Sequence, residues 1–247
     1  MLFKETGRAD KPVIVLLHGG GLSYWSFLRV AERLAGDYRV VTPVIDGHGD
    51  DSGEPFVSIE DSAGKLLEYI DRRHGGRVYA IGGLSLGAQI AAEALSQRGG
   101  VASYAILESA LVIPSPMLAA MSGPVYKMCY GLIKKRWFAK WQARSMFIPD
   151  DLFERYFADS QKMTCQSLIN MAVSNARYEL KDGIERTNAK TLVIVGEKEI
   201  GLMRKSAEAL HRRIPGSELY VASSMSHGEL SLARPEEYVE IVKRLFG

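Results

Sequence analysis

The chain has 247 residues, of which 47% are hydrophobic and 24% are charged, and its formal net charge is +2. This composition is typical of a soluble globular protein, and so small a charge gives no general attraction to nucleic acid or membrane. Only two cysteines are present, which excludes a disulfide framework and a cysteine-rich metal site. We expect one α/β domain in a reducing compartment, the cytoplasm, with no signal peptide and no membrane-spanning segment.

The first half of the chain alternates apolar strands with helices. The first ten or so residues leave room for one short strand. Beyond them, short runs rich in Val, Ile and Leu predict strands at 13–17, 39–42 and 104–108, and helical patterns cover 26–34 and 58–73. Such alternation predicts a mostly parallel central sheet, joined by right-handed crossovers and covered by helices on both faces.

Residues 78–95 carry the most informative pattern, an apolar strand that runs directly into a helix. Between the two lies Gly83-Leu84-Ser85-Leu86-Gly87, which reads Gly-x-Ser-x-Gly. Glycines two residues on either side of Ser85 remove side chains that would collide across so tight a corner. The free N–H groups and the positive dipole end of the helix then face whatever Ser85 attacks. The pattern therefore indicates a nucleophile.

Two glycine-rich loops follow the earlier strands. His18-Gly19-Gly20-Gly21 lets backbone amides approach a ligand, but no Gly-Lys-Ser/Thr follows, so it is not a phosphate loop. The loop at 45–53 is rich in Asp and Gly, and we interpret it as a turn because its spacing differs from that of a calcium loop. We expect His18 to be structural, and we expect neither a metal nor a cofactor.

The alternation stops between residues 114 and 187. This segment has no convincing strand and holds six of the nine methionines and two of the three tryptophans, and residues 114–149 carry basic but no acidic side chains. We predict a core domain of residues 1–113 and 188–247 with a helical cap inserted at 114–187. The large apolar side chains of the cap either line a pocket or pack a small core of their own. The basic first half offers a third possibility, contact with an anionic surface.

After the insertion the α/β pattern resumes. Strands are predicted at 191–195 and 218–221, and helices at 203–214 and 235–246. Because ligands bind beyond the carboxyl ends of parallel strands, polar residues at those ends are candidates for a site. Five such residues stand at or just after predicted strand ends: His18, Ser85, Glu108, Glu199 and His227.

In these motifs the sequence resembles the α/β-hydrolase superfamily, over nearly the whole chain outside the cap. Residues 18–21 are similar to the family's oxyanion loop, and residues 83–87 to its nucleophile elbow. Residues 196–199 resemble its acid loop and residues 226–228 its histidine loop. The sequence departs from the family pattern in two ways. The N-terminal strands are truncated, and Glu199 occupies a position where the family usually has Asp.

The resemblance makes Ser85 the nucleophile. A serine hydroxyl becomes reactive when a base removes its proton, and His227 suits that role near neutral pH. The imidazolium that forms needs a carboxylate partner. We favour Glu199, in the acid loop, and keep Glu108 as the alternative acid, because some hydrolases of this fold carry their acid after that strand.

The resemblance also assigns the oxyanion-binding N–H groups to the backbones of Gly20 and Leu86. We predict a serine hydrolase that cleaves the carboxylic ester, or thioester, of a small or medium-sized apolar substrate through an acyl-enzyme intermediate. Two alternatives stay open: a hydrolase-fold receptor with little turnover, and an enzyme that hydrolyses a carbon–carbon or other non-ester bond. The expected partner is a small ester-like molecule, with no nucleic acid and no stable membrane insertion, and the sequence leaves the oligomeric state open.

Overall fold

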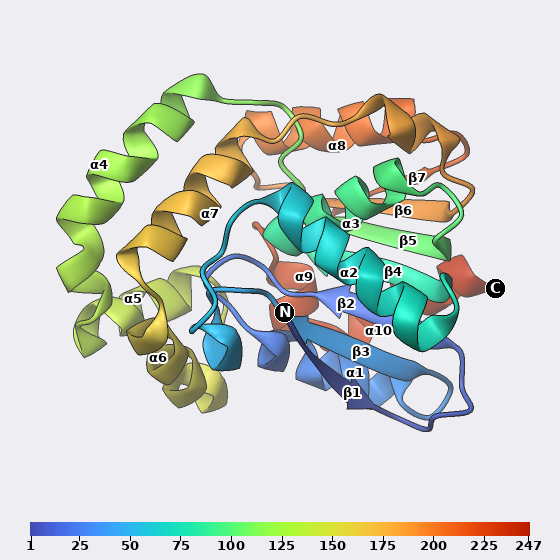
Figure 1. Cartoon of the computed structure of the whole chain (residues 1–247), viewed down its shortest axis with the longest axis horizontal. Coiled ribbons are helices and arrows are strands. Elements are labelled where there is room, and N and C mark those ends of the chain that lie inside the picture. Colours follow the sequence, from blue (N-terminus) through green and yellow to red (C-terminus); the bar gives the residue numbers. More distant parts are fainter.

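A seven-stranded sheet forms the centre of the computed structural model, which describes all 247 residues (Figure 1). The strand order is β1-β3-β2-β4-β5-β6-β7, in which only β1 runs antiparallel to its neighbour. The predicted class, a mostly parallel α/β sheet, is thus confirmed. The strands are β1 (Leu2–Thr6), β2 (Val13–Leu17), β3 (Arg39–Val44), β4 (Val78–Leu84), β5 (Ala102–Glu108), β6 (Lys190–Gly196) and β7 (Glu218–Ala222).

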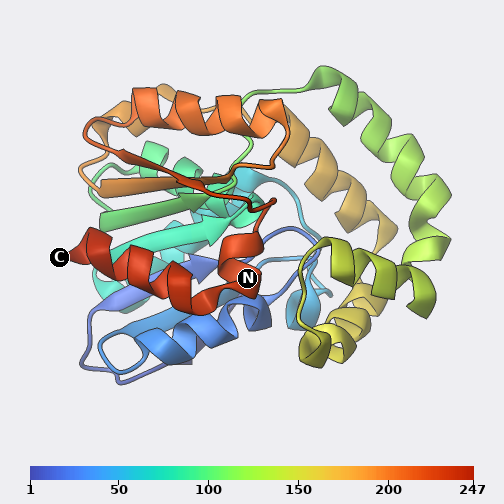
Figure 2. The ribbon, with the colours of Figure 1, turned by 180° about the vertical axis from the view of Figure 1, so that it is seen from behind.

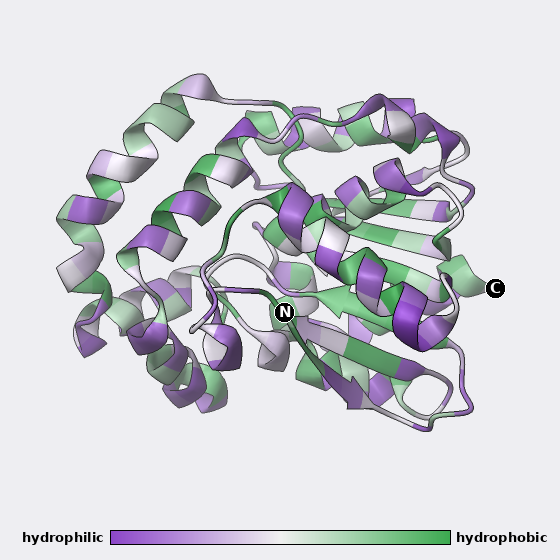
Figure 3. Cartoon of the chain, viewed as in Figure 1, coloured by the Kyte–Doolittle hydropathy of each residue, from purple (hydrophilic) through white to green (hydrophobic).

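Helices cover both faces of the sheet, so the central strands are apolar on both sides. On β2, Val15 and Leu17 pack into one hydrophobic cluster, and Ile14 and Leu16 pack into a second cluster on the opposite face. The first cluster includes side chains of α2 (Ile59–His74), α3 (Leu86–Gln97) and α8 (Gly201–Arg213). The second includes those of α1 (Leu28–Leu34) and α10 (Pro235–Phe246), which Figure 2 shows on the back of the sheet. Figure 3 shows this pattern as hydrophobic strands under helices with hydrophilic outer bands.

Three short elements add detail that the sequence prediction did not contain. The helix predicted at 26–34 begins as a 3-10 turn, η1 (Tyr24–Phe27), before α1. Another 3-10 turn, η2 (Gly49–Asp51), lies in the loop predicted as a turn, and a short helix, α9 (Glu229–Ala233), follows His227. Elements of three to five residues are too short to show a helical period in the sequence.

Between β5 and β6 the chain forms helices and no strand. The four main ones are α4 (Pro116–Ile133), α5 (Arg136–Ser145), α6 (Phe153–Lys162) and α7 (Cys165–Arg177), with short turns η3 (Asp150–Leu152) and η4 (Asp182–Arg186). We call α4 to α7 the cap helices. Side chains of α4 and α7 line a cavity together with Ser85, so these two helices lie beyond the carboxyl end of β4. The domain boundaries at 113/114 and 187/188 stay predictions.

The cap helices are fastened to the rest of the chain unevenly. The indole of Trp25 in η1 donates a hydrogen bond of 2.8 Å to Asp159 in α6. The amide of Asn170 in α7 donates one of 2.8 Å to the backbone carbonyl of Phe56. Helix α4 instead bonds only within the cap, where the Tyr130 hydroxyl donates to a carbonyl in the loop between α6 and α7 at 3.0 Å. Helix α4 is therefore held by packing and by its neighbours in the cap.

Candidate active site

Ser85 occupies the corner between β4 and α3 with a positive φ of 54°. Its backbone is fixed on both sides, because its N–H donates to the carbonyl of Glu108 at 2.8 Å and its carbonyl accepts from Gln89 at 3.0 Å. A Cβ atom at Gly83 would lie 2.5 Å from the backbone of Gly87, and one at Gly87 would lie 2.2 Å from a backbone oxygen of β2. The sequence therefore folds into the strained strand–turn–helix corner that the motif predicts.

His227 and Glu199 come together from two different loops. The ring Nδ1 of His227 lies 2.7 Å from Oε2 of Glu199, whose side chain is buried while that of His227 is half exposed. Oε1 of the same carboxylate accepts the backbone N–H of Gly196 and the hydroxyl of Ser109, each at 2.7 Å. A carboxylate at Nδ1 places the proton of a neutral imidazole there, which leaves Nε2 free to accept another proton.

Two opposing effects set the pKa of the Glu199 carboxyl. Burial alone would raise it, but the hydrogen bond and charge of His227, with the donors at Gly196 and Ser109, bring the pKa below its usual value. The group is therefore ionised at neutral pH. It can stabilise a positive charge that develops on His227.

Ser85 and His227 line two cavities in common, of about 400 and 110 Å³. The hydroxyl and the imidazole thus share one space at the carboxyl edge of the sheet. No hydrogen bond joins the two side chains in this structure. Such contacts are commonly long in ligand-free sites and tighten when substrate binds.

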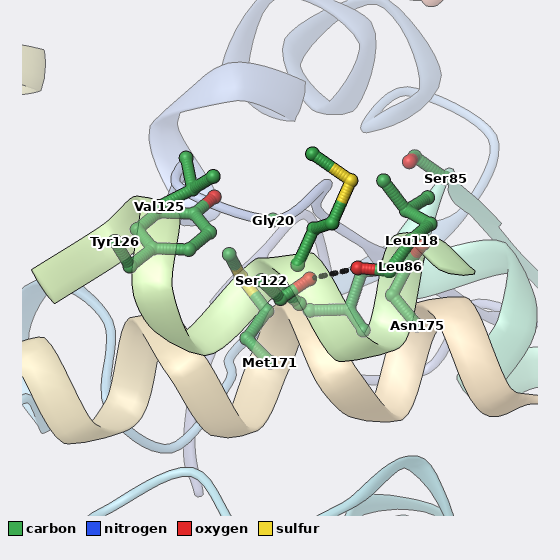
Figure 4. Close-up of a pocket in the computed structure, with 11 residues that line it drawn as sticks. Gly20, Ser85, Leu86, Leu118, Ser122, Val125, Tyr126, Met171 and Asn175 are labelled. Atoms are coloured by element: carbon green, nitrogen blue, oxygen red, sulfur yellow. Dashed lines mark hydrogen bonds between the residues drawn. The ribbon is translucent and has the colours of Figure 1, made fainter. Parts of the chain in front are cut away.

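Gly20 and Leu86 meet Ser85 around a further cavity of about 390 Å³ (Figure 4). Leu86 is the first residue of α3, so its N–H has no acceptor within the helix. A Cβ atom at Gly20 would lie 2.8 Å from the sulfur of Met171, so the glycine lets α7 approach the loop. The structure thus brings the two predicted oxyanion donors to the cavity beside the predicted nucleophile.

Glu108 is placed differently from Glu199. Its side chain is buried, Oε1 accepts the backbone N–H of Ser231 at 3.3 Å, and Oε2 has no hydrogen-bond partner. Burial raises the pKa of the Glu108 carboxyl to about 7. It makes no hydrogen bond to His227, whose carboxylate partner in this structure is Glu199.

His18 has a structural setting, as the sequence predicts. Its Nε2 accepts the backbone N–H of Ile45 at 3.1 Å, which leaves Nδ1 to donate to the carbonyl of Gly19 at 2.9 Å. Burial lowers the pKa of His18 to about 3, so the ring is neutral. The fold contains no group of three or more His, Cys, Asp or Glu side chains placed to hold a metal ion.

Sequence reasoning missed Ser109 and Asn175. Ser109 directly follows β5, has a positive φ of 54°, and bonds the Glu199 carboxylate. Asn175 in α7 lines two cavities beside Ser85, and Gln89 accepts a hydrogen bond of 2.8 Å from its amide. The only signal for Ser109 was its place at a strand end beside Glu108, and Asn175 lies in a helix whose position the sequence did not define.

A strained serine at the corner of a mostly parallel α/β sheet, with a histidine–carboxylate pair at the same edge, is the arrangement of the α/β-hydrolase class. The sequence agrees with the geometry. The chain belongs to the alpha/beta hydrolase family, whose model matches residues 14–241.

Two similar esterases match nearly the whole chain at low sequence identity. The chain is 26% identical to a pimeloyl-[acyl-carrier protein] methyl ester esterase of Neisseria meningitidis, over 92% of this chain and 93% of that protein. A thermophilic esterase of Thermogutta terrifontis superposes with a TM-score of 0.79 at 20% identity, over 99% of this chain and 92% of the other. A shorter match of 49% identity to the magnesium-chelatase 30 kDa subunit of Rhodobacter capsulatus spans 45 residues, 18% of this chain and 16% of that protein.

Proposed function

We propose that this protein is a serine esterase that hydrolyses carboxylic esters, or thioesters, of small or medium-sized apolar acids through an acyl-enzyme intermediate. The observation that carries the proposal is the 2.7 Å hydrogen bond between His227 and the buried Glu199, beside cavities that His227 shares with Ser85. The esterases among the distant relatives support the reaction class, since two of them match over nearly the whole chain.

Acylation begins when Nε2 of His227 takes the proton of Ser85 as Oγ attacks the carbonyl carbon of the ester. The carbonyl electron pair moves to oxygen, and the backbone N–H groups of Gly20 and Leu86 stabilise the oxyanion. Glu199 stabilises the imidazolium. When the tetrahedral intermediate collapses, the bond to the alcohol breaks and His227 gives its proton to the leaving oxygen. Water then repeats the sequence on the acyl-enzyme and releases the acid.

The direction of proton transfer assigns the cavities to the two halves of the substrate. The leaving alcohol must lie beside His227, because His227 protonates it. His227 lines the cavities of about 400 and 110 Å³ but not the one of about 390 Å³ that holds Gly20 and Leu86. We therefore assign the acyl chain to the 390 Å³ cavity, which we call the acyl cavity.

The walls of the acyl cavity fit an uncharged chain. They are mostly apolar and come from α4 and α7: Leu118, Met121, Val125, Tyr126, Met171 and Ala172 (Figure 4). The cavity of about 400 Å³ on the His227 side differs in that charged residues, Lys198 and Glu199, are among those that line it. The volume of the acyl cavity, about 390 Å³, falls within the range of small-molecule sites. An uncharged acyl group of medium length is the expected acid half of the substrate.

The test combines labelling with turnover. A fluorophosphonate should label Ser85 covalently, and the protein should hydrolyse p-nitrophenyl esters of increasing acyl length. Both the labelling and the hydrolysis should be lost in Ser85→Ala. Activity should fall on acidification, because a protonated imidazole cannot accept the serine proton. A folded protein that is neither labelled nor active on any ester or thioester would contradict the proposal and favour a receptor. Labelling without ester or thioester cleavage would favour a non-ester reaction.

A further inference from the structure

The outer face of α5 exposes two tryptophans and two cations. Trp137, Lys140, Trp141 and Arg144 follow the spacing that places residues on one helix face. The tryptophans are 67% and 62% exposed, although the third tryptophan of the chain, Trp25, is 2% exposed. Large aromatic side chains are costly to leave in water, so this face is unusual for a surface helix.

The adjoining helix α4 exposes an apolar stripe. Met117, Met121, Val125, Met128 and Leu132 share one face at helical spacing and are 40% to 79% exposed. Figures 1 and 2 show α4 and α5 together at the end of the molecule opposite the C-terminus. We call the exposed faces of α4 and α5, with the turn at Lys135 between them, the cap surface.

The cap surface carries positive charge without compensation. No acidic residue occurs between 114 and 149. Arg136 is engaged by Glu154, and the Lys134 ammonium donates to three backbone carbonyls near the end of α6. Four exposed cations of this segment form no ion pair: Lys127, Lys135, Lys140 and Arg144.

We propose that the cap surface docks this protein on an anionic lipid surface, with the apolar side chains of α4 and α5 at the headgroup boundary and the cations on lipid phosphates. Exposed Trp and Met beside unpaired Lys and Arg are the composition of interfacial helices. A second copy of the chain fits poorly, because a twofold contact would pack this positively charged surface against an identical one. None of the helices is long and apolar enough to cross a membrane, so the contact is peripheral.

Docking in this way would place the acyl cavity next to the lipid. Met121 and Val125 belong both to the exposed stripe and to the cavity wall. The lipid contact is a binding property, and it can be measured without ester hydrolysis.

The experiment uses the full chain carrying Ser85→Ala, so that no lipid is cleaved. Sedimentation with vesicles of phosphatidylcholine alone, and with added phosphatidylglycerol, measures binding. Tryptophan emission reports the depth of the contact, because Trp25 is buried and only Trp137 and Trp141 face outward. We expect binding to the anionic vesicles with a blue shift, and weaker binding as salt rises.

Charge reversal locates the contact. Lys140→Glu with Arg144→Glu should weaken vesicle binding by about tenfold or more, from about 1 kcal/mol for each cation near an anionic surface. The matched control is Lys205→Glu with Arg212→Glu, which makes the same change in net charge on the exposed face of α8 and should alter binding by less than about twofold. Trp137→Ala with Trp141→Ala should weaken binding and remove the blue shift.

Three outcomes would overturn the proposal. One is an absence of binding to anionic vesicles, and another is an equal loss in the cap and α8 variants, which indicates unspecific attraction. The third is binding to soluble polyglutamate that matches vesicle binding in strength and in its response to the cap variants, which indicates an acidic protein partner. The same surface variants, with Ser85 restored, should still hydrolyse a soluble short-chain ester. This control distinguishes a loss of lipid binding from a failure of the proposed esterase function.

Discussion

The hydroxyl of Ser109 donates a hydrogen bond to Oε1 of Glu199, the carboxylate oxygen opposite the one that contacts His227. Both oxygens of Glu199 therefore have fixed partners. Ser109 leaves β5 with a positive φ, and its backbone N–H donates to the carbonyl of Ile194 in β6 at 2.8 Å. The residue after β5 and the last residue of β6 thus both hold the Glu199 carboxylate beside His227.

Removal of the Ser109 hydroxyl should lower kcat while leaving KM nearly unchanged, because the hydroxyl orients Glu199 and touches no substrate. The variant to use is Ser109→Gly, since glycine adopts the positive φ of this position without strain. Loss of a hydrogen bond to a charged group corresponds to about 1.5–3 kcal/mol, or roughly 10- to 150-fold in kcat as an upper range. Steady-state kinetics on a short-chain ester test this. A rise in KM at constant kcat would contradict a positioning role.

Glu199→Gln should lower kcat by about 10³- to 10⁴-fold with ester binding nearly intact, because an amide neither orients the imidazole correctly nor stabilises its charge. The matched control is Glu108→Gln, the same chemical change one strand away, which should retain most activity. The reverse result, an active Glu199→Gln and a folded but inactive Glu108→Gln, would assign the acid to Glu108. Burst kinetics with a p-nitrophenyl ester separate acylation from binding in both variants.

Glu108 should make the free energy of unfolding depend on pH. Burial raises its pKa from 4.5 to about 7 in the folded protein. The protonated form therefore stabilises the fold below pH 4.5, and this contribution is lost as the pH rises to about 7. The full change corresponds to roughly 3 kcal/mol. Urea unfolding at pH 5 and pH 8 should show Glu108→Gln gaining stability relative to the wild type as pH rises, and a constant difference would contradict this account.

The cavity assignment predicts that tryptophan introduced into each of the two cavities affects a different half of the substrate. Val125→Trp narrows the acyl cavity and should lower kcat/KM for long acyl chains by about tenfold or more while sparing acetyl esters. Leu202→Trp narrows the cavity beside His227 and should discriminate among alcohols instead. A two-way series of acyl and alcohol lengths measures both. If Leu202→Trp selected against long acyl chains, the two cavities would have to exchange roles.

Much of the core was predictable because its signals are local. The apolar runs at 13–17 and 191–195 mark central strands, which are buried on both faces and are apolar at every position except Thr191. The corner at Ser85 was predictable because its two glycines are required by backbone contacts within the motif and with β2. The expectation that His227 has a carboxylate partner came from the resemblance and the chain order of the motifs.

What the sequence did not provide depends on contacts between distant segments. Ser109 meets Glu199 only because β5 and β6 are neighbours in the sheet and run parallel toward the same edge. The sequence left open whether the tryptophans of 114–187 pack inward or face outward. Helix α5 buries Ala139 and Ala143 and exposes Trp137 and Trp141. Periodicity alone cannot show which face is buried when apolar residues occur on both faces of a helix.

The uneven fastening of the cap has a consequence for substrate range. Helices α6 and α7 are hydrogen-bonded to the core, through Asp159 and Asn170, whereas α4 is bonded only to its neighbours in the cap. One wall of the acyl cavity is thus a helix with no hydrogen bond to the core, so acids of different girth should be accepted by displacing α4 while the reacting groups stay in place. Hydrogen exchange should be faster in α4 than in α7, and an acyl-phosphonate adduct of growing chain length should change the protection of α4 alone.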